Sequence, residues 1–198
     1  MPVIKIPKKR HRNATTKFQC DSMKILASLQ RVDHTLFEKI VGVTRSNNWA
    51  VSARAISATG DGSLHVLAAV LLLVLHPLPE VIVPALVTTM ALERALYWPM
   101  KNSLKRLRPA DKFDSFSSLI KASDRFSFPS GHSSAAFALA TLLSLCIGGP
   151  LVGLLMWATS VALSRVVLGV HFPGDVAAGA LIGGSTAFIN AHYWGLIT

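Results

Sequence analysis

Cysteine is scarce in this sequence of 198 residues, which contains only Cys20 and Cys146. Cys20 lies in a basic segment and Cys146 in an apolar run, so we expect no disulfide between them. Neither has a metal-ligating partner at a useful spacing, which argues against a zinc site. There is also no HExxH motif or carboxylate cluster to hold another metal. The sequence therefore predicts neither a metal nor a cofactor.

Other absences narrow the class of protein. The start of the chain lacks the charged, apolar and small-residue regions of a signal peptide, so none is expected. Acidic residues are few, with ten Asp and Glu against twenty Lys and Arg and a net charge of +10. Such a balance can indicate nucleic-acid binding. However, 51% of the residues are hydrophobic and gather in long runs, which favours a membrane protein with no nucleic-acid partner.

The apolar runs predict an all-α integral-membrane bundle of about five spanning helices. We expect these spans at residues 57–76, 81–100, 130–148, 151–168 and 174–192. A span needs ~20 residues, so the first is short if it begins at Gly62 rather than near Ser57. The links HPLPE and GGP predict tight hairpins, and a longer loop covers Lys101–Phe128. Small residues in the last span, such as Gly179 and Gly183, permit close helix contact.

The region before the spans differs in character. Residues 1–24 are polar and basic, which predicts a loose tail on an anionic surface. Residues 25–47 show helical spacing of apolar residues, but Arg31, Asp33, Glu38 and Lys39 are too many charges for hydrocarbon. We expect an amphipathic helix on the membrane interface, followed by the spans in a single membrane-embedded domain over residues 25–198.

The cations predict an orientation. Eleven Lys and Arg precede residue 55, seven lie in 101–128, and Arg94 and Arg165 approach the same face, which accounts for all twenty. The positive-inside rule then places this face in the cytoplasm, and an odd number of spans puts the C-terminus on the opposite side. The expected location is a bacterial inner membrane or an endoplasmic-reticulum-type membrane.

Three polar clusters stand at ends of different spans, and the hairpin topology brings all three to one membrane face. They are KNSLKRLRP, which contains Lys101 and Arg108, then PSGH at 129–132, and SRVVLGVHFPGD, which contains Arg165, His171 and Asp175. Any one of them alone would be an ordinary helix end. Their convergence indicates a shared site.

The residue types in these clusters suit phosphate chemistry. Lys101, Arg108 and Arg165 supply the charge that phosphoryl oxygens need, and arginine binds them bidentately. Ser130 and Gly131 open a helix, so we expect free backbone amides to point at an anion there. If the last helix begins at Pro173, Asp175 can reach back to one imidazole nitrogen of His171 and leave the other nitrogen free to attack.

The set K-x6-RP, PSGH and SR-x5-H-x3-D resembles the type-2 phosphatidic acid phosphatase family, relatives of the vanadium haloperoxidases. It matches at every defining position over Lys101–Asp175, and KRLRPA, SFPSGH and LSRVVLGVH look most like the presqualene diphosphate phosphatase branch. The resemblance implies a metal-independent lipid phosphatase that works through a phosphohistidine. His171 would be the nucleophile, His132 the acid and then the base, and Asp175 the residue that orients His171. The phosphate would be bound by Lys101, Arg108, Arg165, Ser130 and Gly131.

The sequence leaves several alternatives open. A polyisoprenyl diphosphate is the first choice of substrate, followed by phosphatidate, phosphatidylglycerol phosphate and lysolipid phosphates. A phosphotransferase with the same phosphohistidine, or a non-catalytic lipid-phosphate binder, would share these motifs. The oligomeric state and the pathway are not indicated.

Charged residues outside the motifs have less certain roles. Glu93 and Arg94 fall inside the second span, either as an ion pair with another helix or as residues that orient Arg108 or Arg165. Arg106 either attracts an anionic headgroup or is simply solvated, and Asp124 is expected to be a cap or a surface charge.

Overall fold

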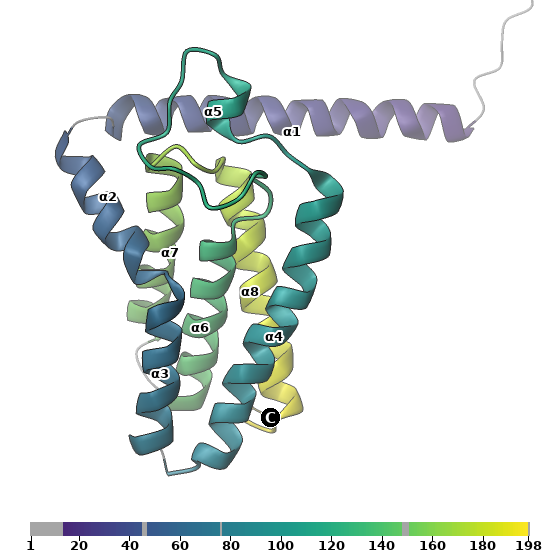
Figure 1. Cartoon of the computed structure of the whole chain (residues 1–198). Coiled ribbons are helices and arrows are strands. Elements are labelled where there is room, and N and C mark those ends of the chain that lie inside the picture. Colours follow the sequence, from purple (N-terminus) through teal and green to yellow (C-terminus); the bar gives the residue numbers. More distant parts are fainter. Residues whose placement is uncertain (1–13, 45–46, 76, 148–150, 198) are drawn as a thin grey trace, which may run out of the picture.

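The computed structural model describes residues 14–44, 47–75, 77–147 and 151–197, and every regular element within these residues is a helix. The helices are α1 (Ala14–Thr44), α2 (Asn47–Thr59), α3 (Gly62–Leu75), α4 (Pro79–Leu104), α5 (Pro109–Lys112), α6 (Gly131–Ile147), α7 (Leu151–Val167) and α8 (Pro173–Tyr193). Figure 1 shows the longer helices gathered in an upright bundle, with α1 lying across one end and the C-terminus near the other. The all-helical class expected from the sequence is confirmed.

Proline marks the start of two long helices. α4 begins at Pro79 and α8 at Pro173, where the fixed φ and the missing N–H of proline suit the first turn. α4 ends where Lys105 adopts a left-handed φ of 44°, which turns the chain toward α5. The last helix therefore begins at the proline that the sequence indicated, directly after His171 and Phe172.

Two segments differ from the sequence-based prediction. α1 begins at Ala14, so residues 14–24 are helical rather than a loose tail; residues 1–13 of that tail and the GGP link lie outside the described residues. The first expected span is two helices, α2 and α3, bent by 44°. The bend lies at Gly60 and Asp61, and two glycines flanking Asp61 weaken the helix there.

The number of spans stays a prediction. Among the described residues, Pro79–Lys112 is the one stretch long and apolar enough to cross a membrane alone. The bent pair Trp49–Thr59 and Gly62–Leu75 would make a second if it forms one span. α6 and α7 have 17 residues each, which is short for a bilayer of ordinary thickness.

α1 is docked onto the end of the bundle rather than only resting on a surface. Its Phe37 and Val41 are buried in a cluster with Phe172 and Val176, at the start of α8. Its Asp33 accepts a hydrogen bond from the Gly174 amide at 2.7 Å and forms an ion pair with Arg106 at 2.6 Å. A charge that looked unsuited to hydrocarbon therefore holds α1 to the first turn of α8.

Close packing of α6 against α8 depends on glycine. A Cβ at Gly183 would lie 1.9 Å from the Ser134 carbonyl oxygen, and one at Gly179 would lie 2.5 Å from that of Ser130. These clashes are with backbone atoms, so a side chain would force the helices apart. The close contact sets the first turn of α6, which carries His132, beside the start of α8.

A pair of glycine substitutions tests this packing. Gly183→Ala is expected to destabilise the protein by about 1–3 kcal/mol, because the added methyl group overpacks the helix contact. Gly184→Ala is the matched control, since a Cβ there would approach only Thr141 Oγ1, at 3.7 Å. Thermal unfolding in one detergent compares the two. Equal melting temperatures for both variants would show that the close contact at Gly183 does not determine the stability of the protein.

Candidate active site

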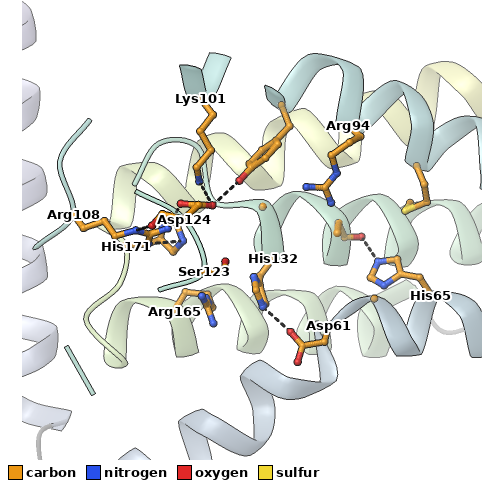
Figure 2. A pocket seen from close by; sticks show the side chains of 16 residues that line it. Asp61, His65, Arg94, Lys101, Arg108, Ser123, Asp124, His132, Arg165 and His171 are labelled. Carbon is orange, nitrogen blue, oxygen red and sulfur yellow. Dashed lines mark hydrogen bonds and ion pairs between the residues drawn. The ribbon is translucent and has the colours of Figure 1, made fainter. Parts of the chain in front are cut away.

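A cavity of about 370 Å³ lies among the ends of α3, α4, α6 and α7 and the loops beside them (Figure 2). Six of the eight residues that the sequence proposed for the site line this cavity: Lys101, Arg108, Gly131, His132, Arg165 and His171. They come from three motifs far apart in the chain. The helical hairpins thus bring the three clusters to one place.

Lys101 and Arg108 meet around Asp124. The Lys101 Nζ lies 2.9 Å from Asp124 Oδ2, and Arg108 Nη2 pairs with Asp124 Oδ1. Burial alone would raise the pKa of Asp124, but the hydrogen bonds from Lys101 and Arg108 outweigh it and hold that pKa below its usual value. The two cations are therefore held in place by an ionised carboxylate.

Arg165 supplies the third cation. It stands in the last turn of α7, its residue is 5% exposed, and its Nη1 donates to Ser57 Oγ at 2.7 Å. Its Nε is buried and has no hydrogen-bond partner among the described residues. A buried guanidinium that lines a cavity with a free donor is well suited to receive an anion.

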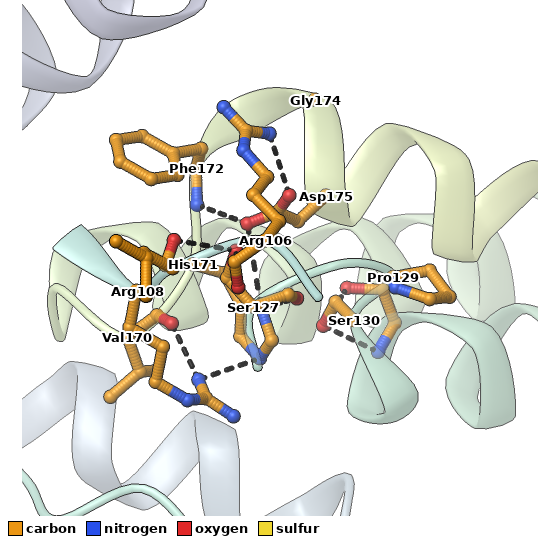
Figure 3. Close-up of polar contacts among 12 residues, drawn as sticks. Arg106, Arg108, Ser127, Pro129, Ser130, Val170, His171, Phe172, Gly174 and Asp175 are labelled. Atoms are coloured by element: carbon orange, nitrogen blue, oxygen red, sulfur yellow. Dashed lines mark hydrogen bonds and ion pairs between the residues drawn. The ribbon is translucent and has the colours of Figure 1, made fainter. Parts of the chain in front are cut away.

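His171 is held by backbone groups as well as by charge (Figure 3). Its Nδ1 lies 2.7 Å from the Ser127 carbonyl oxygen, which can only accept, so Nδ1 carries the proton. Its Nε2 lies 3.5 Å from Arg108 Nη1 and presents its lone pair there. Arg108 Nη1 also donates to the Val170 carbonyl oxygen at 2.6 Å. The ring is thus fixed in the tautomer whose Nε2 carries no proton.

The role of Asp175 differs from the one expected from the sequence. Its Oδ2 lies 3.7 Å from His171 Nδ1, too far for a hydrogen bond, and instead accepts from the Phe172 amide at 2.8 Å. Its Oδ1 pairs with Arg106 at 2.7 Å. The tautomer of His171 is therefore set by the Ser127 carbonyl, while Asp175 adds a nearby negative charge and holds the start of α8.

Ser130 also lies behind the cavity rather than in its wall. Its amide donates to the Asp175 carbonyl oxygen at 3.0 Å, and its hydroxyl accepts from that of Ser133 at 3.0 Å. The expectation of a free amide at Ser130 is therefore wrong in this structure. Gly131 does line the cavity, and its amide belongs to the first turn of α6, where N–H groups have no partner within the helix.

His132 has a partner that the sequence did not indicate. Its Nε2 lies 2.8 Å from Asp61 Oδ1, at the break between α2 and α3. Because a carboxylate only accepts, this contact places a proton on Nε2. The bend that divides the first expected span thus delivers a carboxylate to the second histidine.

The structure shows the surroundings of three charged residues whose roles the sequence left undecided. Arg106 lies outside the cavity and donates hydrogen bonds to Asp33 and Asp175. Its central guanidinium carbon lies 4.3 Å from the centre of the Phe172 ring, so Arg106 joins α1 to the start of α8 rather than being a solvated charge. Glu93 is 1% exposed, and its charged neighbour is Arg94 of the same helix, at 3.6 Å. Among the described residues, neither Glu93 nor Arg94 forms an ion pair with another helix, and Arg94 lines the cavity without a hydrogen bond to Arg108 or Arg165.

Two site residues carried little sequence signal. Asp124 is a single carboxylate in an irregular loop, and no spacing marks it. Asp61 stands in the run Gly-Asp-Gly between two apolar stretches, which could have indicated a break.

The pH dependence of the site should reflect the burial of His171. Burial lowers the pKa of His171 to about 4, with Arg108 and Arg165 acting in the same direction and Asp175 opposing them. A depressed pKa keeps the ring neutral down to that pH, so the nucleophilic form is lost only as pH falls through about 4. We expect the corresponding acid limb of kcat/KM there, well below the usual histidine value near 6.5. Titration of the substrate alone by phosphorus NMR distinguishes an ionisation of the substrate from that of His171. An acid limb near pH 6.5 that the substrate does not explain would contradict the lowered pKa of His171.

Comparison with known proteins agrees with this geometry. The sequence profile of the PAP2 superfamily matches residues 83–196. The chain belongs to this superfamily. The match contains all eight of the residues proposed from the three motifs, and the family resemblance expected from them is confirmed.

Individual relatives of this PAP2 protein match it in sequence or in fold. The lipid A 4′-phosphatase of Bacteroides thetaiotaomicron is 34% identical over 87 residues, which is 40% of this chain and 38% of that protein. The chain thus aligns with about two fifths of that curated relative. The crystal structure of LpxE from Aquifex aeolicus has a TM-score of 0.72 and 29% identity, covering 80% of this chain and 94% of that one. A transmembrane PAP2-type phosphatidylglycerolphosphate phosphatase from Bacillus subtilis shares the fold, with a TM-score of 0.70 and 23% identity over 86% of this chain and 88% of that one.

Proposed function

We propose that this PAP2 protein is an integral-membrane lipid phosphatase that releases phosphate from a lipid phosphate or diphosphate monoester. The observation that carries the proposal is the His171 ring. Its Nδ1 is hydrogen-bonded to a backbone carbonyl, its Nε2 lies 3.5 Å from Arg108 Nη1, and the residue lines a cavity together with Lys101, Arg108 and Arg165. A neutral nucleophile beside three cations is what attack on a phosphoryl group requires.

In the first step, Nε2 of His171 attacks phosphorus and forms a P–N bond, while the bond from phosphorus to the leaving oxygen breaks. Lys101, Arg108 and Arg165 stabilise the charge on the non-bridging oxygens, and arginine forks hold them bidentately. His132 acts in its doubly protonated form, in which Nε2–H stays with Asp61 and the second proton, on Nδ1, goes to the leaving oxygen. The Asp61 carboxylate, 2.8 Å away, orients that ring.

In the second step, water attacks the phosphohistidine. His132, now without its extra proton, takes a proton from the water as the P–O bond forms and the P–N bond breaks. Inorganic phosphate leaves, and His171 returns to its neutral form. The charge needed in both steps comes from side chains of the chain itself, so we propose that turnover does not depend on a divalent metal.

The outer surface of the bundle supports a place within the bilayer. Large apolar side chains are exposed along α3, α4, α7 and α8, including Val74 at 71% and Leu181 at 74%. In water, exposed apolar faces of this extent would promote association. The site lies at the end of the bundle that α1 crosses, so a substrate whose tail stays in lipid can present its phosphate there (Figure 1).

We propose that this end faces the cytoplasm, because it carries the cations. In the topology predicted from the sequence, seventeen of the twenty Lys and Arg lie on this side even without Lys101, Arg108 and Arg165, and none lies on the other. A reporter that is active only outside the cytoplasm, fused after Thr198, is expected to be active. Activity of a cytoplasm-specific reporter at the same place would contradict the orientation.

A substrate panel tests the proposed activity. Detergent-purified protein, assayed in chelator with phosphatidate, phosphatidylglycerol phosphate, a lysolipid phosphate and a polyisoprenyl diphosphate, is expected to release inorganic phosphate from at least one. Transfer of labelled phosphate to a second lipid would indicate a phosphotransferase instead. Binding without turnover of any of them would indicate a lipid-phosphate binding protein and would overturn the proposal.

A further inference from the structure

Arg94 is a cation of the cavity that the proposed mechanism does not use. It precedes Lys101 by seven residues in α4, so both lie on the same face of the helix, about 10 Å apart along its axis. Figure 2 shows its side chain reaching from α4 toward the middle of the cavity, on the side away from Arg108 and His171. His65 and Met90 line the cavity as well.

The contacts of Arg94 leave its guanidinium available. Its Nε lies 3.6 Å from Glu93 Oε2, and its central carbon lies 4.9 Å from the centre of the Tyr97 ring. Neither contact is a hydrogen bond, and no acceptor among the described residues lies within hydrogen-bond distance of the group. The Arg94 side chain is 49% exposed, whereas Glu93 is buried beside it. Glu93 offsets the charge of Arg94 without occupying its donors.

The position of Arg94 matches the direction in which a leaving group departs. In-line attack places the leaving oxygen opposite the nucleophile. His171 stands at one side of the cavity, and Arg94 reaches in from the other, past the acid His132 (Figure 2). Glu93 pairs with Arg94 through charge alone, so the guanidinium N–H groups stay available to a ligand in this membrane helix. The group that follows the scissile phosphate therefore meets a positive charge.

We propose that Arg94 forms a second anion subsite, which binds the phosphate between the scissile phosphate and the lipid tail. This inference rests on the proposed function and makes a lipid diphosphate the preferred substrate over the matching monophosphate. His171 Nε2 bonds to the terminal phosphorus, the bond from that phosphorus to the bridging oxygen breaks, and a lipid monophosphate leaves. Arg94 stabilises the negative charge that this leaving group gains, a charge that the alcohol released from a monophosphate lacks.

Two substrates with the same tail test the inference. Farnesyl diphosphate and farnesyl monophosphate are assayed with detergent-purified wild-type protein, Arg94→Gln and Arg94→Lys. The ratio of kcat/KM for the diphosphate to that for the monophosphate is expected to fall about ten- to a hundredfold in Arg94→Gln, as losing a charge-assisted contact implies. Arg94→Lys should restore part of it. Arg125→Gln removes an exposed cation that does not line the cavity and should leave the ratio unchanged.

An unchanged ratio in a folded Arg94→Gln variant would overturn the second subsite. If that variant does not fold, inhibition of the wild type replaces it: methylenediphosphonate should inhibit at least ten times more tightly than inorganic phosphate, and equal inhibition constants would overturn the inference. Failure of the wild type to hydrolyse any substrate of the panel would instead overturn the proposed function, which separates the two outcomes.

Discussion

His171→Asn should lower kcat for a lipid phosphate by about four orders of magnitude or more, as loss of a covalent nucleophile does elsewhere. Asparagine can still donate a hydrogen bond to the Ser127 carbonyl, so the local structure around the substitution should survive. It cannot form the P–N bond. The measurement is phosphate release by purified protein under saturating substrate, with thermal unfolding in the same detergent as the test of folding.

His192→Asn is the matched control for that substitution. His192 is exposed near the end of α8, away from the cavity, and its replacement should leave kcat unchanged. If His171→Asn turned over at the wild-type rate, His171 would not be the nucleophile and the proposed mechanism would fail.

Arg165→Gln should lower kcat/KM by about a hundred- to a thousandfold, the range seen when one donor to a developing oxyanion is removed. Arg165 is buried and lines the cavity, so its guanidinium can bind a phosphate that enters there. Arg165→Lys should recover only part of the loss, because a lysine cannot reach Ser57 and the phosphate with a planar fork.

The same assay on Arg125→Gln controls for loss of one positive charge on this face of the molecule. Arg125 is exposed and does not line the cavity; its central guanidinium carbon lies 5.8 Å from the centre of the Phe126 ring. If kcat/KM fell by less than threefold in a folded Arg165→Gln variant, Arg165 would not bind the substrate phosphate.

The helices could be predicted because apolar periodicity and proline report directly on helix bounds. The ends of the expected spans at 81–100, 130–148, 151–168 and 174–192 lie within four residues of the ends of α4, α6, α7 and α8. The break at Asp61 was missed because the expected span began at residue 57, so most of α2 fell outside it. The docking of α1 was missed because Asp33, read alone, is a charge to be solvated, and its partners Arg106 and Gly174 lie more than 70 residues away.

The site was predictable where its residues form spaced motifs, and not where single groups complete it. Lys101, Arg108, His132, Arg165 and His171 could be assigned to one site because helix ends in a hairpin topology must meet. The Ser127 carbonyl that fixes the His171 tautomer could not be assigned from the sequence. Every residue has a backbone carbonyl, and only the fold places this one beside His171. Asp175 was given that role because a carboxylate four residues away is a common partner, yet the geometry at Pro173 directs it to the Phe172 amide.

Trapping the phosphorylated protein is the most direct test of the mechanism. Wild-type protein mixed with substrate labelled in its terminal phosphate, and quenched in denaturant at alkaline pH to preserve a P–N bond, should carry label on the peptide that contains His171. The label should be absent from His171→Asn and should persist longer in His132→Gln, which lacks the base for the second step. Label on another residue, or rapid phosphate release with no labelled histidine at any time, would contradict the proposed nucleophile.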